Sequence, residues 1–98
     1  MKDERLGELY EALAAGPYPP DCAGEEIDGV ELVLLDDAIA GVASHYVRNT
    51  RPMTAEHREM LTVVIADIDR VWKHLPHDEA RAFYGRARAL GEYLLANR

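Results

Sequence analysis

The chain has 98 residues, of which 48% are hydrophobic, and it carries a net charge of −7 at pH 7. This length fits one domain over residues 1–98, and the hydrophobic content excludes an intrinsically disordered chain. The acidic surface that the charge implies repels phosphate backbones, so we expect no nucleic-acid partner.

Apolar runs in the sequence are much shorter than the roughly 20 residues that cross a bilayer, so we expect no membrane partner. The opening residues MKDERLGELYE are charged where a secretory signal would be apolar. Cys22 is the only cysteine, so no internal disulfide forms. Both features favour a cytoplasmic protein.

Charge is unevenly distributed along the chain. Residues 1–47 carry 2 basic and 11 acidic side chains, a net charge of −9, whereas residues 48–98 carry 9 and 7, a net charge of +2. This asymmetry suits self-association or a basic partner, but solubility explains it equally simply, and we favour solubility.

The first expected helix covers residues 3–15, and Gly16 followed by Pro17 marks its end. Residues 16–29 then form the longest irregular segment, since three prolines within four residues exclude a helix. We expect Tyr18 and Ile27 to anchor this segment to the core. It is either an ordered crossover that lets two helices pack in parallel or across a corner, which we favour, or a binding loop that presents Tyr18 and Cys22.

Residues 29–48 are the expected central helix, which the other segments cover. Its apolar residues recur at spacings of three and four: Leu32, Leu35, Ile39, Val42 and Tyr46. Asp28 followed by Glu31 fits a capping box at its start. A strand over residues 30–35 is the alternative, which we disfavour because the apolar run continues with helical period. Gly41 and its small neighbours favour close approach of another backbone, with simple tolerance as the alternative.

Two further helices are expected over residues 54–75 and 78–97, with Thr54 and Asp78 as their caps and Pro76 between them. The short gap predicts an antiparallel pair. The fold class is therefore all-α, a four-helix bundle-like single domain.

The segment AGPYPPDCAGEEIDGVELVLLDDAIAG, residues 15–41, covers about a quarter of the chain. Its YPP turn, EIDG cap and LVLLD helix start resemble those of small uncharacterised all-α bacterial proteins. The resemblance implies a cap-and-helix unit and brings no activity with it.

Side chains able to bind metal are few and poorly spaced. His74, His77 and Asp78 are the candidates, but the His-x-x-x-His and Glu-x-x-His pairs typical of bundle metal sites do not occur. We favour solvated side chains and a helix cap there, and we expect no cofactor.

No catalytic constellation is evident, so we expect a protein that is not an enzyme. Cys22 lies between Asp21 and Glu25, whose charges raise the pKa of its thiol and make it less reactive. Asp36 lies beside the apolar stripe of the central helix. We expect it to pair with Arg58, Arg70 or Arg86 and fix helix register, with a ligand or catalytic role as the alternative.

Apolar residues at the edges of the helical stripes suggest an interaction surface: Val63, Val71, Tyr84 and Tyr93. We therefore expect a non-enzymatic helical module that self-associates or binds a protein partner. The first alternative is a helical bundle that binds a metal or small ligand through His45, His57, His74 or Asp36. The second is an acidic, antitoxin-like inhibitor of a basic protein.

Overall fold

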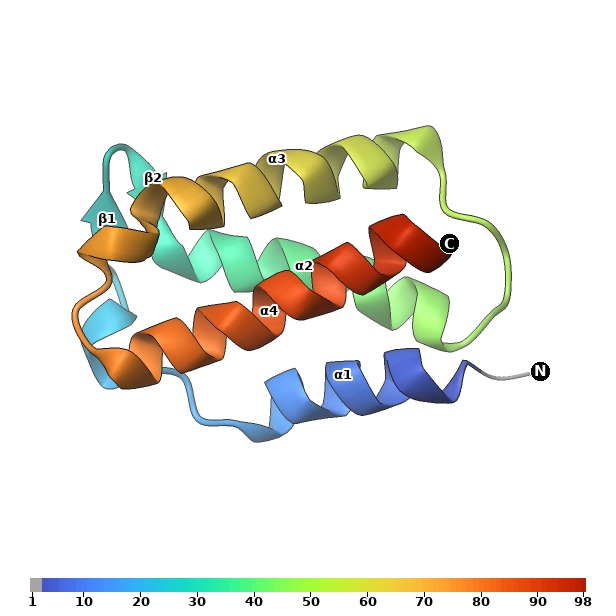
Figure 1. The fold of residues 1–98 in the computed structure, drawn as a ribbon, viewed down its shortest axis with the longest axis horizontal. Helices are drawn as coiled ribbons and strands as arrows, with labels where there is room; N and C mark the ends of the chain where they lie inside the picture. The colour runs from blue at the N-terminus through green and yellow to red at the C-terminus, as the bar shows by residue number, and fades with distance from the viewer. Residues whose placement is uncertain (1–2) are drawn as a thin grey trace.

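The computed structural model describes residues 3–98, in which four helices form a bundle (Figure 1). The helices are α1 (Glu4–Ala15), α2 (Leu32–Val47), α3 (Ala55–Val71) and α4 (Asp78–Asn97). Between them lie the 3₁₀ turns η1 (Pro20–Cys22) and η2 (Trp72–His74) and the short strands β1 (Glu26–Ile27) and β2 (Val30–Glu31). The all-α, bundle-like fold class is confirmed.

Successive helices run in opposite directions (Figure 1). The start of α1, the α2–α3 connection and the end of α4 therefore share one end of the bundle. The β1–β2 hairpin and the α3–α4 connection lie at the other end. The segment between α1 and α2 is thus an ordered connection between antiparallel neighbours, rather than a crossover between parallel helices.

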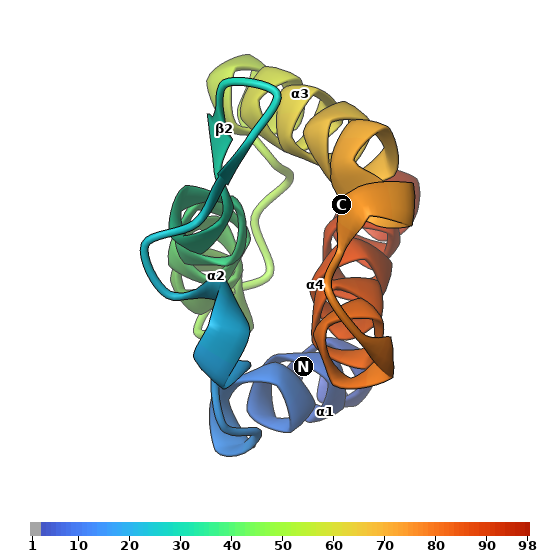
Figure 2. The same cartoon turned by 90° about the vertical axis from the view of Figure 1, so that its left-hand side faces the viewer.

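Viewed along the bundle, α2 and α4 lie on opposite sides, with α3 and α1 completing the ring (Figure 2). Both α2 and α4 contact α1 and α3, and they contact each other. The central position that we expected for α2 alone is therefore shared with α4.

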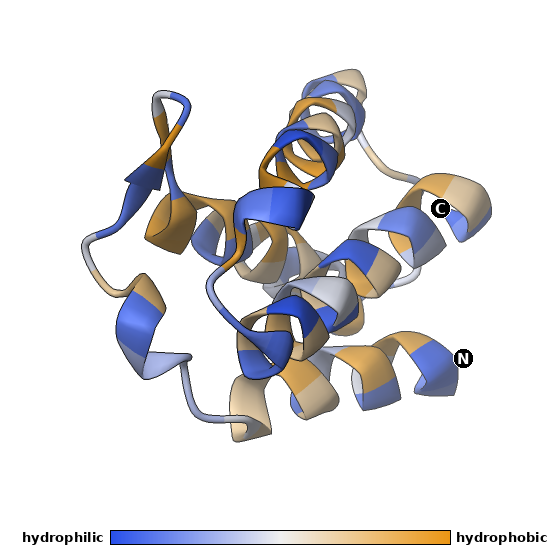
Figure 3. Ribbon diagram, turned by 60° about the vertical axis from the view of Figure 1, so that its left-hand side comes forward, coloured by the Kyte–Doolittle hydropathy of each residue, from blue (hydrophilic) through white to orange (hydrophobic). Residues whose placement is uncertain are grey.

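Apolar side chains from all four helices fill the bundle interior. Hydrophobic and hydrophilic stretches follow one another along the ribbon of the helices, as expected when one side of a helix faces the core (Figure 3). All five expected stripe residues of α2 are buried: Leu32, Leu35, Ile39, Val42 and Tyr46. None of the helices within residues 3–98 is long and apolar enough to cross a membrane.

The start of α2 differs from the capping box expected there. Asp28 and Gly29 form the two-residue turn of the β1–β2 hairpin, with φ values of 50° and 79°. Positive φ at both central residues is what a type I′ hairpin turn requires, and Asp-Gly is among its favoured sequences. Glu31 occupies the cap position of α2 and makes no side-chain capping hydrogen bond. Helix α2 therefore begins at Leu32, and the strand alternative holds only for Val30 and Glu31.

The ends of α3 and α4 lie within a few residues of the expected positions. Thr54 caps α3 by accepting a hydrogen bond from the His57 amide at 3.1 Å. At α4 the cap is His77, whose Nδ1 accepts from the Ala80 amide at 3.1 Å, so the expected cap at Asp78 is wrong by one residue. Helix α3 ends at Val71 rather than near residue 75, because the chain tightens into η2 before Pro76.

Close helix packing occurs at a different glycine from the one expected. Gly41 is exposed, and a Cβ placed on it would meet no atom within 4 Å. Gly91 of α4 is buried, and a Cβ there would lie 3.2 Å from Cδ1 of Ile65. Gly41 is therefore tolerated on a solvent-facing side of α2, whereas Gly91 lets α4 approach α3.

Candidate functional site

Two tyrosine hydroxyls meet where the proline-rich segment crosses α4. The Tyr18 and Tyr84 oxygens lie 2.6 Å apart, and the Tyr84 hydroxyl donates to the Leu32 carbonyl at 2.9 Å. The Tyr84 oxygen also lies 3.4 Å from Oδ1 of Asp36. Burial raises the pKa of Tyr84 well above its usual range, so this hydroxyl keeps its proton.

The two tyrosine hydroxyls of this network offer the Asp36 carboxylate few hydrogen bonds. A hydroxyl carries one proton, and that of Tyr84 is used on the nearer Leu32 carbonyl. The Tyr18 hydroxyl is closer to Tyr84 than to its other acceptor, the Cys22 carbonyl at 3.3 Å. Asp36 thus receives at best a long, shared hydrogen bond from these two side chains.

Asp36 is half-buried without a cationic partner. Within residues 3–98 no basic side chain forms an ion pair with it, so the expected pairing with Arg58, Arg70 or Arg86 is wrong. Arg58 donates to the Leu95 carbonyl at 3.0 Å, and Arg70 pairs with Asp67 at 2.9 Å. Burial, followed by the charge of Asp37, raises the pKa of Asp36 to about 6.

A cavity of about 210 Å³ opens beside this carboxylate, between α1, the proline-rich segment, α2 and α4. Aromatic side chains from three of these elements line it, namely Tyr10, Tyr18 and Phe83. Tyr18 packs edge-on against Phe83, with ring centroids 5.2 Å apart. A single carboxylate in a small aromatic cavity is thus the most distinctive chemical environment that the fold creates.

The proline-rich segment holds Tyr18 in place and buries Cys22. Cys22 has no exposed surface, and burial, followed by the charges of Asp21 and Glu25, raises the pKa of its thiol. The binding-loop interpretation is therefore wrong for Cys22, which is a core residue. Tyr18 is half-buried and anchors the segment as expected, and Ile27 packs against the same core.

The four residues expected to form an interaction surface have different environments. Val63 is exposed, whereas Val71 and Tyr84 are fully buried, so the expectation is wrong for these two. Val71 is the last residue of α3, and the Tyr84 hydroxyl donates to the Leu32 carbonyl. Tyr93 is half-buried, and its hydroxyl donates to Oδ1 of Asp3 at 2.8 Å.

Among residues 3–98, the exposed large apolar side chains form two pairs, which we call the apolar pairs. They are Val33 and Leu34 at the start of α2, with exposed fractions of 36% and 57%, and Met60 and Val63 on α3, with 44% and 54%. Met60 and Val63 are three residues apart and so lie on the same side of α3. Val33, Leu34 and Met60 were not predicted from the sequence, because a position next to an apolar stripe does not decide whether a neighbouring helix covers the side chain.

The three candidate metal ligands at the α3–α4 connection lie in different environments. His77 caps α4, and its Nε2 lies 3.2 Å from Oδ2 of Asp21, while His74 is exposed in η2. Asp78 pairs with Arg81, which lowers the pKa of the Asp78 carboxyl. Across the described residues, no group of three or more His, Cys, Asp and Glu side chains is placed to hold a metal ion.

His45 and His57 flank Tyr46 near the α2–α3 connection. Nδ1 of His57 lies 2.7 Å from the Tyr46 hydroxyl, which also accepts from the Thr54 amide at 3.0 Å. His45 contacts the Tyr46 ring edge-on. These contacts join the start of α3 to the end of α2, so His45, Tyr46 and His57 have a structural role here.

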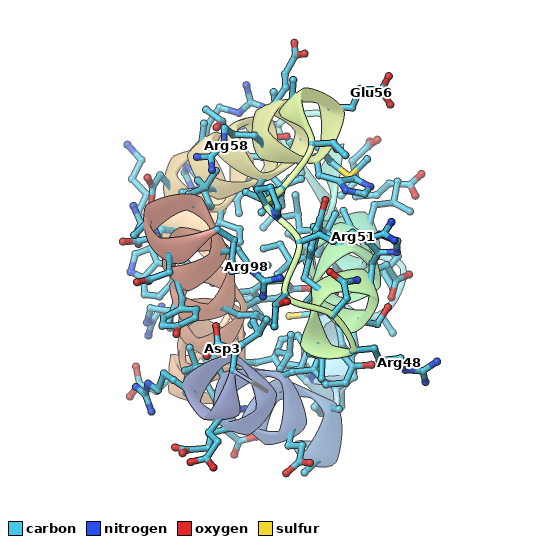
Figure 4. The ribbon with its side chains drawn as sticks, turned by 90° about the vertical axis from the view of Figure 1, so that its right-hand side faces the viewer. Asp3, Arg48, Arg51, Glu56, Arg58 and Arg98 are labelled. Carbon is cyan, nitrogen blue, oxygen red and sulfur yellow. The ribbon has the colours of Figure 1, made fainter. Side chains whose placement is uncertain are left out.

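Arg98 closes the same end of the bundle. Its side chain points from the end of α4 toward the α2–α3 connection, whereas Arg48 and Glu56 point outward (Figure 4). Its guanidinium donates to the carbonyls of Tyr46, Asn49 and Arg51 at 3.2, 2.7 and 2.7 Å. Because the guanidinium is already satisfied by backbone oxygens, we do not regard this end as an anion site.

The chain was compared with protein-family models, with curated proteins and with solved structures, and none of them matches it.

Proposed function

We propose that this protein is a non-enzymatic interaction module that binds a protein partner through the two apolar pairs. The observation that carries the proposal is that Leu34 and Val63, on adjacent helices, each expose more than half of their surface. Fully burying a Leu or Val side chain is worth about 1.5–3 kcal/mol, so covering the exposed portions favours association.

Acidic side chains lie close to both apolar pairs in the sequence, together with Arg58 before the pair on α3. Glu31 and Asp37 flank the pair on α2, and Glu56 and Glu59 precede the pair on α3, all four being exposed. Like charges brought face to face oppose association of two identical copies. We therefore infer a partner that presents apolar side chains among Lys and Arg residues, and self-association is the other outcome to be tested.

The first experiment is the solution mass, measured by light scattering behind a sizing column at two protein concentrations and two salt concentrations. A monomer under all conditions agrees with a separate basic partner. A mass that doubles with concentration and grows with salt assigns the apolar pairs to a second copy of the chain.

The second experiment tests the surface itself. The immobilised protein is exposed to a lysate of its own cells beside the double variant Met60→Ser/Val63→Ser. Thr62→Ser, at an exposed position on another side of the same helix, is the matched control. A protein retained by the wild type and the control, lost with the double variant and released by salt, supports the proposal. Retention that is identical for all three proteins, combined with a monomeric mass, contradicts it.

A further inference from the structure

The Asp36 carboxylate lies in surroundings that an incoming cation would complete. It has no ion-pair partner among the described residues, and the two nearby hydroxyl protons are directed to nearer acceptors. An ionised carboxylate removed from water is stabilised by a cation within hydrogen-bond distance. Of the described side chains that line the cavity, Asp36 alone carries a charge.

The walls of the cavity have the chemistry that binds cations through π faces. The rings of Tyr10, Tyr18 and Phe83 line it together with Leu13 and Ala40. Aromatic rings attract ammonium groups electrostatically, and the attraction is stronger where water is excluded. An aromatic cavity with one carboxylate therefore favours a ligand with a positive charge on an organic body.

Charges of both signs lie next to the cavity. Asp37 adds a second negative charge on α2, next to Asp36. Among the described residues, Arg86 brings a positive charge to these walls: its guanidinium carbon lies 5.9 Å from the Phe83 ring centroid, and its Nη2 lies 3.0 Å from where a Cβ on Gly16 would be. Arg86 lines an adjacent cavity, with Pro17 and Pro19, and forms no ion pair with Asp36.

The size of the cavity limits the ligand. A volume of about 210 Å³ is smaller than the roughly 300–1,000 Å³ of pockets for drug-sized molecules. It corresponds to about seven water molecules at ~30 Å³ each, which suits a molecule of roughly ten non-hydrogen atoms or fewer.

We propose that this cavity binds a small organic cation, a primary amine or a quaternary ammonium compound. Its charged nitrogen pairs with the Asp36 carboxylate and its body packs against Tyr10, Tyr18 and Phe83. The cavity is separate from the apolar pairs, so this binding does not depend on the proposed protein partner.

The test is a titration followed by amide proton–nitrogen correlation spectra of the intact protein. The probes are benzylamine and tetramethylammonium, with benzyl alcohol as a neutral molecule of the same shape and benzoate as an anion. We expect saturable shifts at the amides of Gly16, Asp36 and Ala40 with the two cations. We expect no saturation with benzyl alcohol or benzoate.

Variants separate the carboxylate from general charge effects. Asp36→Asn should weaken benzylamine binding at least about tenfold, as expected when one partner of a poorly hydrated ion pair is removed. Asp37→Asn removes the same charge from an exposed neighbour and should change the affinity by less than about threefold. The spectrum of each variant reports directly whether it is folded. Tyr10→Leu should weaken tetramethylammonium binding by removing a ring.

Three results would overturn the proposal: no saturable shift with either cation, equal binding of benzyl alcohol, or unchanged binding by Asp36→Asn. The Met60→Ser/Val63→Ser variant distinguishes the two proposals, since it should bind benzylamine like the wild type whether or not a protein partner exists.

Discussion

The hydroxyl oxygens of Tyr18 and Tyr84 lie 2.6 Å apart and connect the proline-rich segment to the buried side of α4. This contact joins residues 66 positions apart in the chain, and it continues through the Leu32 carbonyl to the start of α2. The network therefore fixes the position of three elements around the cavity beside Asp36.

Tyr84→Phe should lower the free energy of unfolding by about 1–3 kcal/mol, because it removes two hydrogen bonds, one to the Leu32 carbonyl and one to the Tyr18 hydroxyl. Tyr18→Phe should cost about 1 kcal/mol or less, since Tyr84 keeps its bond to Leu32. The double variant should lose less stability than the sum of the two single losses, because each single loss includes the hydrogen bond between the two tyrosines.

Urea unfolding followed by circular dichroism measures these three losses. Tyr93→Phe is the control, because its hydroxyl bonds to Asp3 in a partly exposed setting. Strictly additive losses for Tyr18 and Tyr84 would show that their contact contributes nothing to stability.

Asp36→Asn should stabilise the protein at neutral pH. The pKa of Asp36 rises from 3.8 to about 6 on folding, so between these values the folded state binds more protons than the unfolded state. The contribution of Asp36 to stability therefore falls as pH rises from about 4 to about 6. At pH 7 the ionised carboxylate costs roughly 1–2 kcal/mol, less than for a fully buried group because water reaches part of it.

The measurement is urea unfolding of the wild type and Asp36→Asn at several pH values from 3.5 to 7.5, a range spanning both pKa values. The other titratable or charged groups around Asp36 are Asp37 on α2, Tyr10 on α1, Tyr18 and Cys22 in the proline-rich segment, and Tyr84 and Arg86 on α4. The advantage of the variant should be absent near pH 4 and complete above pH 6.5. Asp37→Asn is the matched control, and a pH-independent difference for Asp36→Asn would contradict the raised pKa.

Ile39→Ala should destabilise the protein by about 2–5 kcal/mol, since the Ile39 side chain is fully buried and its truncation leaves a cavity. A loss of this size is a large part of the stability of a domain of this length. Leu34→Ala, on the exposed side of the same helix, should cost less than about 1 kcal/mol. Thermal unfolding of the two variants measures both losses of stability. Similar losses would mean that the buried and exposed sides of α2 are assigned incorrectly.

Periodicity predicted the helices and their buried stripes because both depend on the same 3.6-residue repeat. Leu32, Ile39 and Leu61 are buried for that reason. Short sequence motifs that are compatible with two local structures were less informative. Asp28 suits a helix cap and equally a hairpin turn, and the following Gly29 favours the turn because both residues must adopt positive φ.

The environment of Asp36 could not be predicted from the sequence. Tyr84, whose hydroxyl oxygen lies 3.4 Å from the Asp36 carboxylate, is 48 residues away in the chain, and no local pattern specifies which tyrosine reaches the start of α2. Burial at the edge of a stripe is equally a tertiary property. Val71 is fully buried, whereas Val63 on the same helix is exposed.

Two helical glycines allow a direct test of where the helices pack closely. Gly41→Ala should raise the free energy of unfolding by about 0.5–1 kcal/mol, because alanine has the higher helix propensity and its methyl group meets no atom within 4 Å. Gly91→Ala gains the same propensity, but its methyl group would lie 3.2 Å from the Ile65 side chain, which must move. We therefore expect Gly91→Ala to be less stable than Gly41→Ala by about 1 kcal/mol or more. Thermal unfolding of the wild type and the two variants measures this difference in stability. Equal stabilisation would show that Ile65 yields at no cost and that α3 and α4 are not held in close contact at this position.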